Sequence, residues 1–273
     1  MINYPKKGIN IGNEIRKNSF EVKTMKKILK RLLIVVLILA ALIVLVTKII
    51  IPIYASNYYI SKFDLKEYST DIEISIIESD DGYKAYFFDG YGEDTALIFY
   101  PGALVQTESY GELMAELASS GIDCYLIDAP YYMAILEPKA AKHILEDYQD
   151  NYENWYVGGH SMGGVIASKY ASYHSDDLDG LILLASYSID DLTETDLSIL
   201  SIYGSNDQVL DIEAYEENKV NLGSDVEEYV IDGGNHAGFA EYGEQTGDGK
   251  LEIDNQIEIT SEKIAKFIES NVE

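Results

Sequence analysis

Short apolar segments alternate with helix-like segments from Ala96 to the end of the chain, and this alternation constrains the fold more than any other feature. The apolar segments are almost continuous, as in strands that are buried on both faces of a parallel sheet. Helices that connect such strands cover both faces of the sheet. The sequence therefore predicts an α/β fold with a mainly parallel sheet and helices on both faces. We expect strands at 96–100, 122–128, 155–158, 180–186, 197–203 and 226–231, and helices at 108–119, 139–149, 162–174, 211–218 and 259–271.

An antiparallel hairpin is predicted in front of this alternation. Residues 71–78 and 83–89 are short alternating or aromatic runs, and Asp80-Asp81-Gly82 between them is a turn signal. We expect this hairpin at one edge of the sheet.

A long apolar run near the N-terminus has the length of a membrane span. Residues 32–47 carry no charge, and the run continues past Lys48, whose side chain can snorkel, to residue 55. The basic residues before it keep such an N-terminus in the cytoplasm. We therefore predict one folded extracellular domain at 71–273, preceded by a basic cytoplasmic N-terminus at 1–31, a transmembrane signal-anchor at 32–55 and a linker at 56–70.

Two alternatives stay open for the N-terminal segment. A basic flank followed by an apolar run also fits a cleaved signal peptide, with Ile53-Tyr54-Ala55 as a poor cleavage site and a secreted domain as the product. Met25 is followed at once by KKILKR and the apolar run, so a start at Met25 is an alternative to Met1.

Charge is divided unevenly along the chain. Ten of the 20 Lys and Arg lie in residues 1–50 beside only two Glu, which leaves ten basic and 45 acidic residues in 51–273. The resulting formal charge of −35 repels phosphate backbones. We therefore expect no nucleic-acid partner for the folded part.

The strongest local motif is WYVGGHSMGG at residues 155–164, in which a short strand leads directly into G-x-S-x-G and then into a helix. This context is typical of a nucleophile elbow, whose tight turn exposes a serine at the helix N-terminus. Gly159 and Gly163 leave room for the neighbouring backbone. Ser161 is therefore the predicted nucleophile, and the alternative is a glycine-rich turn that only joins strand to helix.

A serine hydroxyl is a weak nucleophile and needs a general base, for which the chain offers four histidines. His143 and His174 lie in predicted helices, and His160 points away from its neighbour Ser161. His236 follows the last expected strand on a glycine-rich loop that can reach over the sheet. We predict His236 as the base.

The acid that orients the base should follow a strand and lie between the serine and the histidine in the chain. Asp207 fits, 46 residues after Ser161 and 29 before His236. The alternative is a turn aspartate, which is common in so acidic a chain. Weaker candidates for the acid are Asp190, Asp191 and Asp196.

An oxyanion hole is also required, because the tetrahedral intermediate places negative charge on the former carbonyl oxygen, and losing one donor costs about 3 kcal/mol. One predicted donor is the backbone N–H of Met162. The other is expected from Ala103 or Leu104, in the loop after the first central strand, where Pro101 has no N–H to offer.

Together these motifs resemble the α/β-hydrolase superfamily, and more narrowly the small hydrolases of the "alpha/beta hydrolase fold-5" family. The resemblance covers residues 94–270 and rests on FYPGALV, GGHSMGG, YGSNDQV and GGNHAGFAEYGEQTGDGKLEI, of which the last is the most specific. It implies an α/β-hydrolase fold. It also implies Ser161 as nucleophile, Asp207 as acid and His236 as base, the residues that the chemistry selects independently.

The resemblance implies attack on an acyl carbonyl and a small acyl-ester substrate. Only ten residues, Tyr187 to Asp196, occupy the place where many relatives insert a helical lid, so we expect a minimal or absent lid and an open site. The leading function is a membrane-anchored serine esterase. Alternatives are an acyltransferase or thioesterase with the same triad, and a surface binding module that has the fold without turnover.

Metal and nucleotide chemistry have no support in the sequence. No two histidines have the i, i+4 spacing of a metal site, and no glycine-rich loop carries the Lys and Ser or Thr of a phosphate binder. We expect neither a metal nor a cofactor.

Overall fold

The architecture comes from a computed structural model of the chain. For residues 11–24 and Tyr54 the structure describes only the backbone. The predicted turn residues Asp80 and Asp81, the cleavage residue Ala55, residues 1–10 and the linker residues 66–70 lie outside the described part. The structure describes residues 11–54, 56–65, 72–79, 82–92, 94–223 and 226–272.

The chain divides into two compact units, Met1–Ser56 and Asn57–Glu273. In the first, helix α1 (Ile11–Leu45) continues through a π-helical turn, Val46–Ile50, into α2 (Ile51–Tyr54). The backbone N–H of Ile51 donates to the carbonyl of Val46, five residues earlier. Pro52 follows and has no N–H to donate, which is a physical reason for the changed hydrogen-bond spacing here.

One helix in the described part has the length and composition to cross a membrane. It extends over Met25–Ile53 and has a mean hydropathy of 3.2. A signal sequence near an N-terminus has the same properties. This helix therefore agrees with the predicted membrane anchor and also with the alternative of a cleaved signal peptide.

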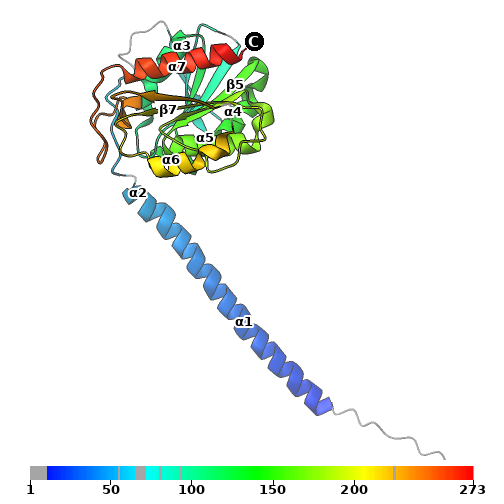
Figure 1. Ribbon diagram of the computed structural model, residues 1–273. Helices are drawn as coiled ribbons and strands as arrows, with labels where there is room; N and C mark the ends of the chain where they lie inside the picture. The colour runs from blue at the N-terminus through cyan, green and yellow to red at the C-terminus, as the bar shows by residue number, and fades with distance from the viewer. Residues whose placement is uncertain are drawn as a thin grey trace, which may run out of the picture. The chain divides into compact units, whose positions relative to one another are not determined.

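The second unit contains one eight-stranded sheet, in the order β1-β2-β4-β3-β5-β6-β7-β8 (Figure 1). Strands β1 and β2 form an antiparallel hairpin at one edge, and β2 also pairs antiparallel with β4; the remaining pairs are parallel. The predicted edge hairpin and mainly parallel sheet are therefore confirmed. The strands are β1 (Glu73–Glu78), β2 (Lys84–Asp89), β3 (Thr95–Tyr100), β4 (Asp123–Ile127), β5 (Asn154–His160), β6 (Gly180–Leu184), β7 (Ser198–Gly204) and β8 (Val226–Ile231).

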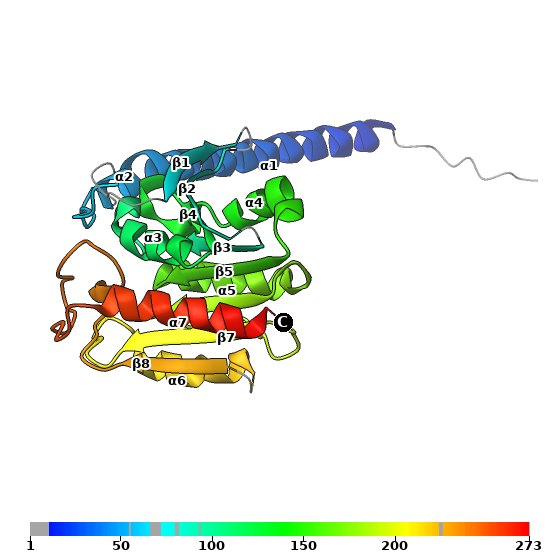
Figure 2. The same cartoon turned by 90° about the horizontal axis from the view of Figure 1, so that it is seen from above.

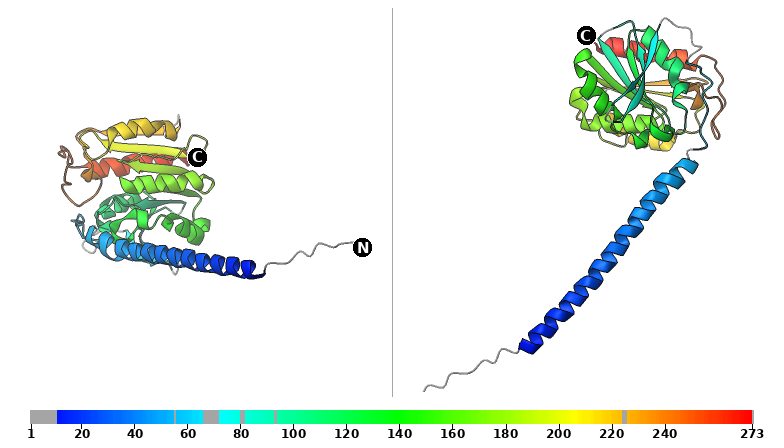
Figure 3. Two further views of the ribbon diagram at one scale, coloured as in Figure 1. Left: turned by 90° about the horizontal axis from the view of Figure 1, so that it is seen from below. Right: turned by 180° about the vertical axis from the view of Figure 1, so that it is seen from behind.

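Helices cover both faces of this sheet. Figure 1 shows α3 and α7 on one face and α4, α5 and α6 on the other, and the views in Figures 2 and 3 keep the sheet between these two layers. The helices are α3 (Gly111–Ser119), α4 (Ala140–Tyr148), α5 (Met162–Tyr173), α6 (Ile212–Asn218) and α7 (Gln256–Asn271). Single 3-10 turns occur at Thr107–Tyr110, Pro130–Tyr132, Ala134–Leu136, Gln149–Asn151, Ser175–Asp177, Lys219–Leu222 and Ala237–Phe239.

Strand β3 explains why the central strands have no polar face. Leu97 and Phe99 pack in the core beneath α3 and α7, whereas Ile98 and Tyr100 pack in the core beneath α4 and α5. Successive side chains of a strand point to opposite faces, so a sheet covered on both sides needs apolar residues at every position. Each fully buried large apolar side chain contributes about 2 kcal/mol.

The described part of the predicted linker lies against the folded unit. The backbone N–H of Tyr59 donates to the carbonyl of Leu104 at 2.7 Å, and the N–H of Lys62 donates to that of Glu241, also at 2.7 Å. Residues 57–65 therefore pack beside two loops at the carboxyl end of the sheet. The side chains of Tyr59 and Leu65 also pack against the core.

The connection that carries a helical lid in many relatives is short in this protein. Strand β6 ends at Leu184, β7 begins at Ser198, and residues 185–197 between them contain no helix. This agrees with the prediction of a minimal lid.

Candidate active site

The turn between β5 and α5 consists of one residue. β5 ends at His160, α5 begins at Met162, and Ser161 between them has φ 54° and ψ −124°. Residues other than glycine rarely adopt a positive φ, because their Cβ atom crowds the backbone. Here the strained turn is held by hydrogen bonds, since the N–H of Ser161 donates to the carbonyl of Leu184 at 2.9 Å and the hydroxyl of Ser186 donates to the carbonyl of Ser161 at 2.8 Å.

The glycines predicted for this elbow have a steric role. A Cβ atom on Gly159 would overlap the backbone of Gly163, and a Cβ atom on Gly163 would overlap the carbonyl oxygens of Tyr100 and Pro101. The elbow therefore packs directly onto the end of β3. Only glycine at these two positions permits that approach.

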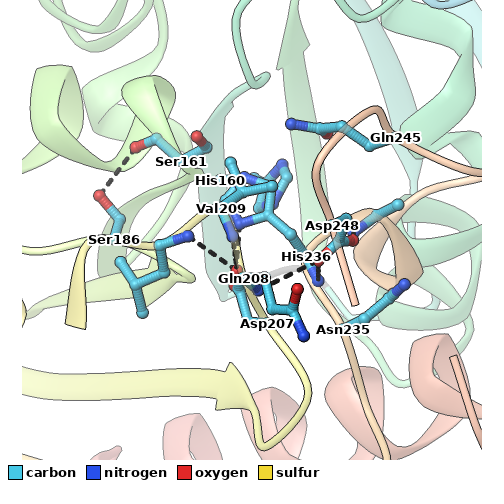
Figure 4. A network of polar contacts seen from close by, with 12 residues as sticks. His160, Ser161, Ser186, Asp207, Gln208, Val209, Asn235, His236, Gln245 and Asp248 are labelled. Atoms are coloured by element: carbon cyan, nitrogen blue, oxygen red, sulfur yellow. Dashed lines mark hydrogen bonds and ion pairs between the residues drawn. The ribbon is translucent and has the colours of Figure 1, made fainter. Parts of the chain in front are cut away.

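The predicted acid and base are in contact. Nδ1 of His236 lies 2.8 Å from Oδ2 of Asp207, and both side chains are almost completely buried (Figure 4). The other carboxylate oxygen of Asp207 accepts the backbone N–H groups of Val209 at 2.9 Å and Leu210 at 2.7 Å. A carboxylate fixed in this way keeps a proton on Nδ1 of the imidazole and leaves Nε2 free to act as a base.

Ser161 lies beside this pair without touching it through a hydrogen bond. The ring of His160, the residue before Ser161, has its centroid 4.5 Å from that of His236. The Oγ atom of Ser161 makes no hydrogen bond with any residue that the structure describes. In unliganded enzymes the contact between nucleophile and base is often long and closes only when substrate binds.

Two backbone N–H groups beside Ser161 have no partner among the described residues. They belong to Met162, the first residue of α5, and to Ala103, in the loop after β3. The N–H of Leu104 donates to the carbonyl of Tyr132 at 2.7 Å, and the N–H of Gly102 donates to the hydroxyl of Tyr110 at 2.9 Å. Of the two predicted donors in this loop, Leu104 is therefore engaged, whereas Ala103 has no partner among the residues that the structure describes.

His160 has a packing role, as its position in the motif indicates. Its Nδ1 atom lies 2.7 Å from the hydroxyl of Tyr110, and its ring packs against Phe239. Burial, together with the neighbouring ring of His236, lowers the pKa of His160 well below its ordinary value. His160 is therefore neutral and links the elbow to the loop that carries Ala103.

The other two histidines lie on the helices and away from the acid. The ring of His143 on α4 stacks on Tyr83, and the ring of His174 at the end of α5 stacks on Tyr170. Their ion-pair contacts are with neighbouring Glu146 and Asp177. Neither histidine contacts Asp207.

Residues that the sequence analysis did not select hold the loop of His236. The side-chain amide of Gln256 accepts the N–H of Asn235 at 2.9 Å and donates to its carbonyl at 2.8 Å. The carboxylate of Asp248 accepts the N–H of Ala237 at 2.9 Å. The segment GDG around Asp248 was visible as part of the most specific motif, but its contacts with backbone groups have no sequence signature.

A cavity of about 670 Å³ lies beside this loop. Its walls include Asn235, Ala237 and Asp248, but neither Ser161 nor His236. The cavity is therefore lined by the residues on either side of His236, but not by the predicted nucleophile or base. Among the described residues no three His, Cys, Asp or Glu side chains form a group that could hold a metal ion.

The sequence profile of a family described as "Alpha/beta hydrolase family" matches residues 96–260, more than half of the chain. This protein belongs to the alpha/beta hydrolase family. The matched segment contains the elbow, Asp207 and His236, so the resemblance inferred from the motifs is confirmed. No curated protein sequence matches this hydrolase significantly.

Solved structures share the hydrolase fold at low sequence identity. The Francisella virulence factor BioJ is 17% identical with a TM-score of 0.57, over 74% of this chain and 85% of that one. A soluble variant of monoglyceride lipase from Saccharomyces cerevisiae is 13% identical with a TM-score of 0.58, over 77% and 98%. Carboxyl esterase 2 from the mycorrhizal fungus Tuber melanosporum is 14% identical with a TM-score of 0.55, over 75% and 89%.

Proposed function

We propose that this hydrolase cleaves carboxylic esters through an acyl-enzyme, with Ser161 as nucleophile, His236 as general base and Asp207 as the acid that orients it. The observation that carries the proposal is the 2.8 Å contact between His236 and Asp207, buried next to a serine at φ 54°. A strained serine beside a buried histidine–aspartate pair is the arrangement that acyl transfer requires. A turn that only joined β5 to α5 would require neither the strain nor the buried pair.

In the first half of the reaction, Oγ of Ser161 attacks the carbonyl carbon of the ester while its proton passes to Nε2 of His236. The carbonyl oxygen becomes negatively charged and accepts hydrogen bonds from the N–H groups of Met162 and Ala103. When the tetrahedral intermediate collapses, the bond to the alkoxide breaks and His236 returns the proton to the departing alcohol. The acyl group is then bound to Ser161.

In the second half, water attacks the same carbonyl carbon and gives its proton to His236. The bond between Ser161 and the acyl carbon breaks, the carboxylic acid leaves, and the proton returns to Oγ. Asp207 keeps its charge throughout and stabilises the imidazolium that forms twice in each turnover.

Family membership and esterase or lipase neighbours support an ester as the substrate. The short connection between β6 and β7 supports a small ester that reaches Ser161 without passing a helical lid. The strongly acidic composition of residues 51–273 disfavours polyanionic substrates.

The test is covalent labelling of the full chain in a maltoside detergent, which contains no ester, with a fluorophosphonate probe. The activated serine displaces fluoride from phosphorus, so intact mass should show one adduct on the wild type and none on Ser161→Ala or His236→Ala. Labelled protein should also lose turnover of nitrophenyl esters of short and long acyl chains.

Two matched controls separate chemistry from folding. Ser168→Ala removes a buried hydroxyl of α5 that bonds to the carbonyl of Val165, and His174→Ala removes a histidine at the end of the same helix. Both should label like the wild type. A folded wild type that takes no label would contradict the triad and favour a binding module, and turnover of thioesters alone would favour a thioesterase.

We also propose that the helix Met25–Ile53 anchors the enzyme in a membrane, with the N-terminus in the cytoplasm and the hydrolase domain outside. The 29-residue length of the helix supports a span, and Lys26, Lys27, Lys30 and Arg31 at its start support this orientation.

Extraction of membranes with alkaline carbonate tests the anchor. Val36→Arg combined with Leu39→Arg should release the protein, because each charge at a helix centre opposes insertion by about 3 kcal/mol. Ile60→Arg, outside the helix, should leave it in the membrane. A mature mass that begins near Asn57 would replace the anchor with a cleaved signal peptide, and protection from protease added to intact cells would contradict the outward orientation.

A further inference from the structure

One carboxylate outside the proposed triad contacts the backbone of both loops that carry the acid and the base. Oδ1 of Asp248 accepts the N–H of Gln208 at 3.3 Å and that of His236 at 3.3 Å, while Oδ2 accepts the N–H of Ala237 at 2.9 Å. Gln208 directly follows Asp207 in the chain. Figure 4 shows Asp248 next to His236.

The chemistry of these contacts requires a carboxylate. An ionised carboxylate offers only acceptor sites, about four of them, whereas an amide offers acceptors on one side and donors on the other. The groups that point at Asp248, including the N–H of Gly249 at 2.8 Å, are all donors. Hydrogen bonds to a charged acceptor are also about twice as strong as neutral ones.

The backbone around Asp248 is shaped to bring it there. Gly247 has φ 87°, a conformation that favours glycine, and a Cβ atom on Gly249 would overlap the carbonyl oxygen of Asn206. The side-chain amide of Asn206 donates to the carbonyl of Lys250 at 3.1 Å. The segment 247–250 is therefore docked against the loop of Asp207, and Asp248 reaches from it to the loop of His236.

We propose that Asp248 is a positioning residue that sets the ring of His236 against Asp207 by fixing the backbone of both loops. The inference rests on the proposed function for its effect on catalysis. Two rotatable bonds separate the imidazole from its backbone, so a displaced backbone displaces the ring. A misplacement of about 1 Å at a catalytic group costs about 100-fold in rate.

The kinetic test compares Asp248→Asn with Asp179→Ala in the full chain. The Asn variant keeps the shape of the side chain. Its NH₂ group replaces one acceptor oxygen, so a donor then faces backbone N–H groups that are themselves donors. Asp179 is the matched control, because its carboxylate accepts the N–H of Trp155 at 2.7 Å at the opposite end of the sheet. We expect Asp248→Asn to lower kcat about 10- to 100-fold with KM changed less than about threefold, and Asp179→Ala to leave both constants unchanged.

A spectroscopic test follows the ring of His236 directly. With ¹⁵N-labelled histidine the spectrum contains only four residues, and His236→Gln assigns the signal of interest. In the neutral form of the ring, the contact with Asp207 should hold the proton on Nδ1. Asp248→Asn should move the His236 nitrogen shifts toward a mixture of the two tautomers, which a loss of stability in the folded protein would not do.

The outcomes separate the inference from the proposed function. The positioning role is overturned if Asp248→Asn has the kcat and the His236 nitrogen shifts of the wild type. It is also overturned if the loss of activity is no larger than the fraction of the variant that is unfolded. If the wild type neither turns over esters nor takes the fluorophosphonate, while Asp248→Asn still shifts the His236 signals, the proposed function fails and the positioning role stands.

Discussion

The hydroxyl of Tyr110 lies 2.7 Å from Nδ1 of His160 and also accepts the N–H of Gly102 at 2.9 Å. One hydroxyl thus joins the elbow, through the residue before Ser161, to the loop that contains Ala103. The hydroxyl can accept a second hydrogen bond or donate its own proton, so the tautomer of His160 sets the direction of the bond to Nδ1. The two halves of the proposed oxyanion hole are therefore linked through the core.

Replacing this tyrosine should affect both stability and catalysis. Tyr110→Phe leaves the Gly102 N–H and a His160 nitrogen buried without partners, at a cost of about 1–3 kcal/mol in the free energy of unfolding. It also releases the Ala103 loop, and we expect kcat to fall about tenfold. Unfolding in urea is followed by the fluorescence of Trp155, the single tryptophan of the chain.

Tyr215→Phe is the comparison for this prediction. The Tyr215 hydroxyl is bonded to Ser201 at 2.8 Å and to Glu228 at 2.6 Å, so its loss should lower stability while kcat is retained. Full activity in Tyr110→Phe would show that the oxyanion loop does not depend on this hydroxyl.

Asp207→Asn tests the orientation of the base. An amide at this position can donate to Nδ1 of His236, which would place the imidazole proton on Nε2 and remove the basic nitrogen that Ser161 needs. By analogy with the serine-protease triad, kcat should fall about 10⁴-fold while the fold is kept. Rates of fluorophosphonate labelling measure this loss. Asp191→Asn should label normally, because Asp191 bonds to Thr193 within its own turn and to no other described residue. Equal losses in the two variants would contradict the assignment.

Gly163→Ala should prevent the elbow from packing. The added methyl would overlap the carbonyls of Tyr100 and Pro101, which belong to the backbone and cannot rotate away. We expect a loss of about 3 kcal/mol or more in the free energy of unfolding, measured by urea denaturation. Gly223→Ala is the control, because among the described residues its methyl would meet Thr193 at an ordinary contact distance of 3.8 Å, so its cost comes from backbone strain at φ 79°, about 1–3 kcal/mol. Similar midpoints for the two variants would show that the elbow can adjust.

The features predicted well from the sequence are those fixed by local patterns. Strand and helix alternation located the sheet, because burial on both faces requires apolar runs such as residues 96–100. The elbow was visible because the turn at Ser161 demands glycines at fixed spacing. Chain order after strands selected Asp207 and His236, and the structure brings these two side chains into contact; their roles as acid and base stay a prediction.

The features that were not predicted depend on contacts between distant backbone groups. Leu104 and Ala103 could not be distinguished by sequence, since the difference is a hydrogen bond to the carbonyl of Tyr132. Helix α7 begins three residues earlier than the apolar spacing predicts, at Gln256, whose side chain bonds to the backbone of Asn235. Every residue has backbone N–H or C=O groups, so such contacts leave no residue-type signal.

A pair of carboxyl groups at the surface of α3 should make stability depend on pH. Burial raises the pKa of Glu112 above its ordinary value, and the negative charges of Glu241 and Glu116 and a hydrogen bond with Glu241 add to this effect. Glu116 is itself bonded to the hydroxyl of Ser261 on α7, and burial likewise raises its pKa. The folded state therefore favours the protonated form of Glu112.

A raised folded pKa stabilises the protein below the ordinary pKa of the carboxyl group, and this contribution is lost as the pH rises through the folded value. Glu112→Gln resembles the protonated form at every pH. We therefore expect its urea midpoint, read from Trp155, to match the wild type near pH 4 and to exceed it near pH 7, above the ordinary Glu pKa of about 4.3. Glu217→Gln, on the exposed side of α6, is the surface control for the change of side chain. A Glu112→Gln midpoint that differs from the wild type by a constant amount across this range would mean that Glu112 has the same pKa in the folded and unfolded chains.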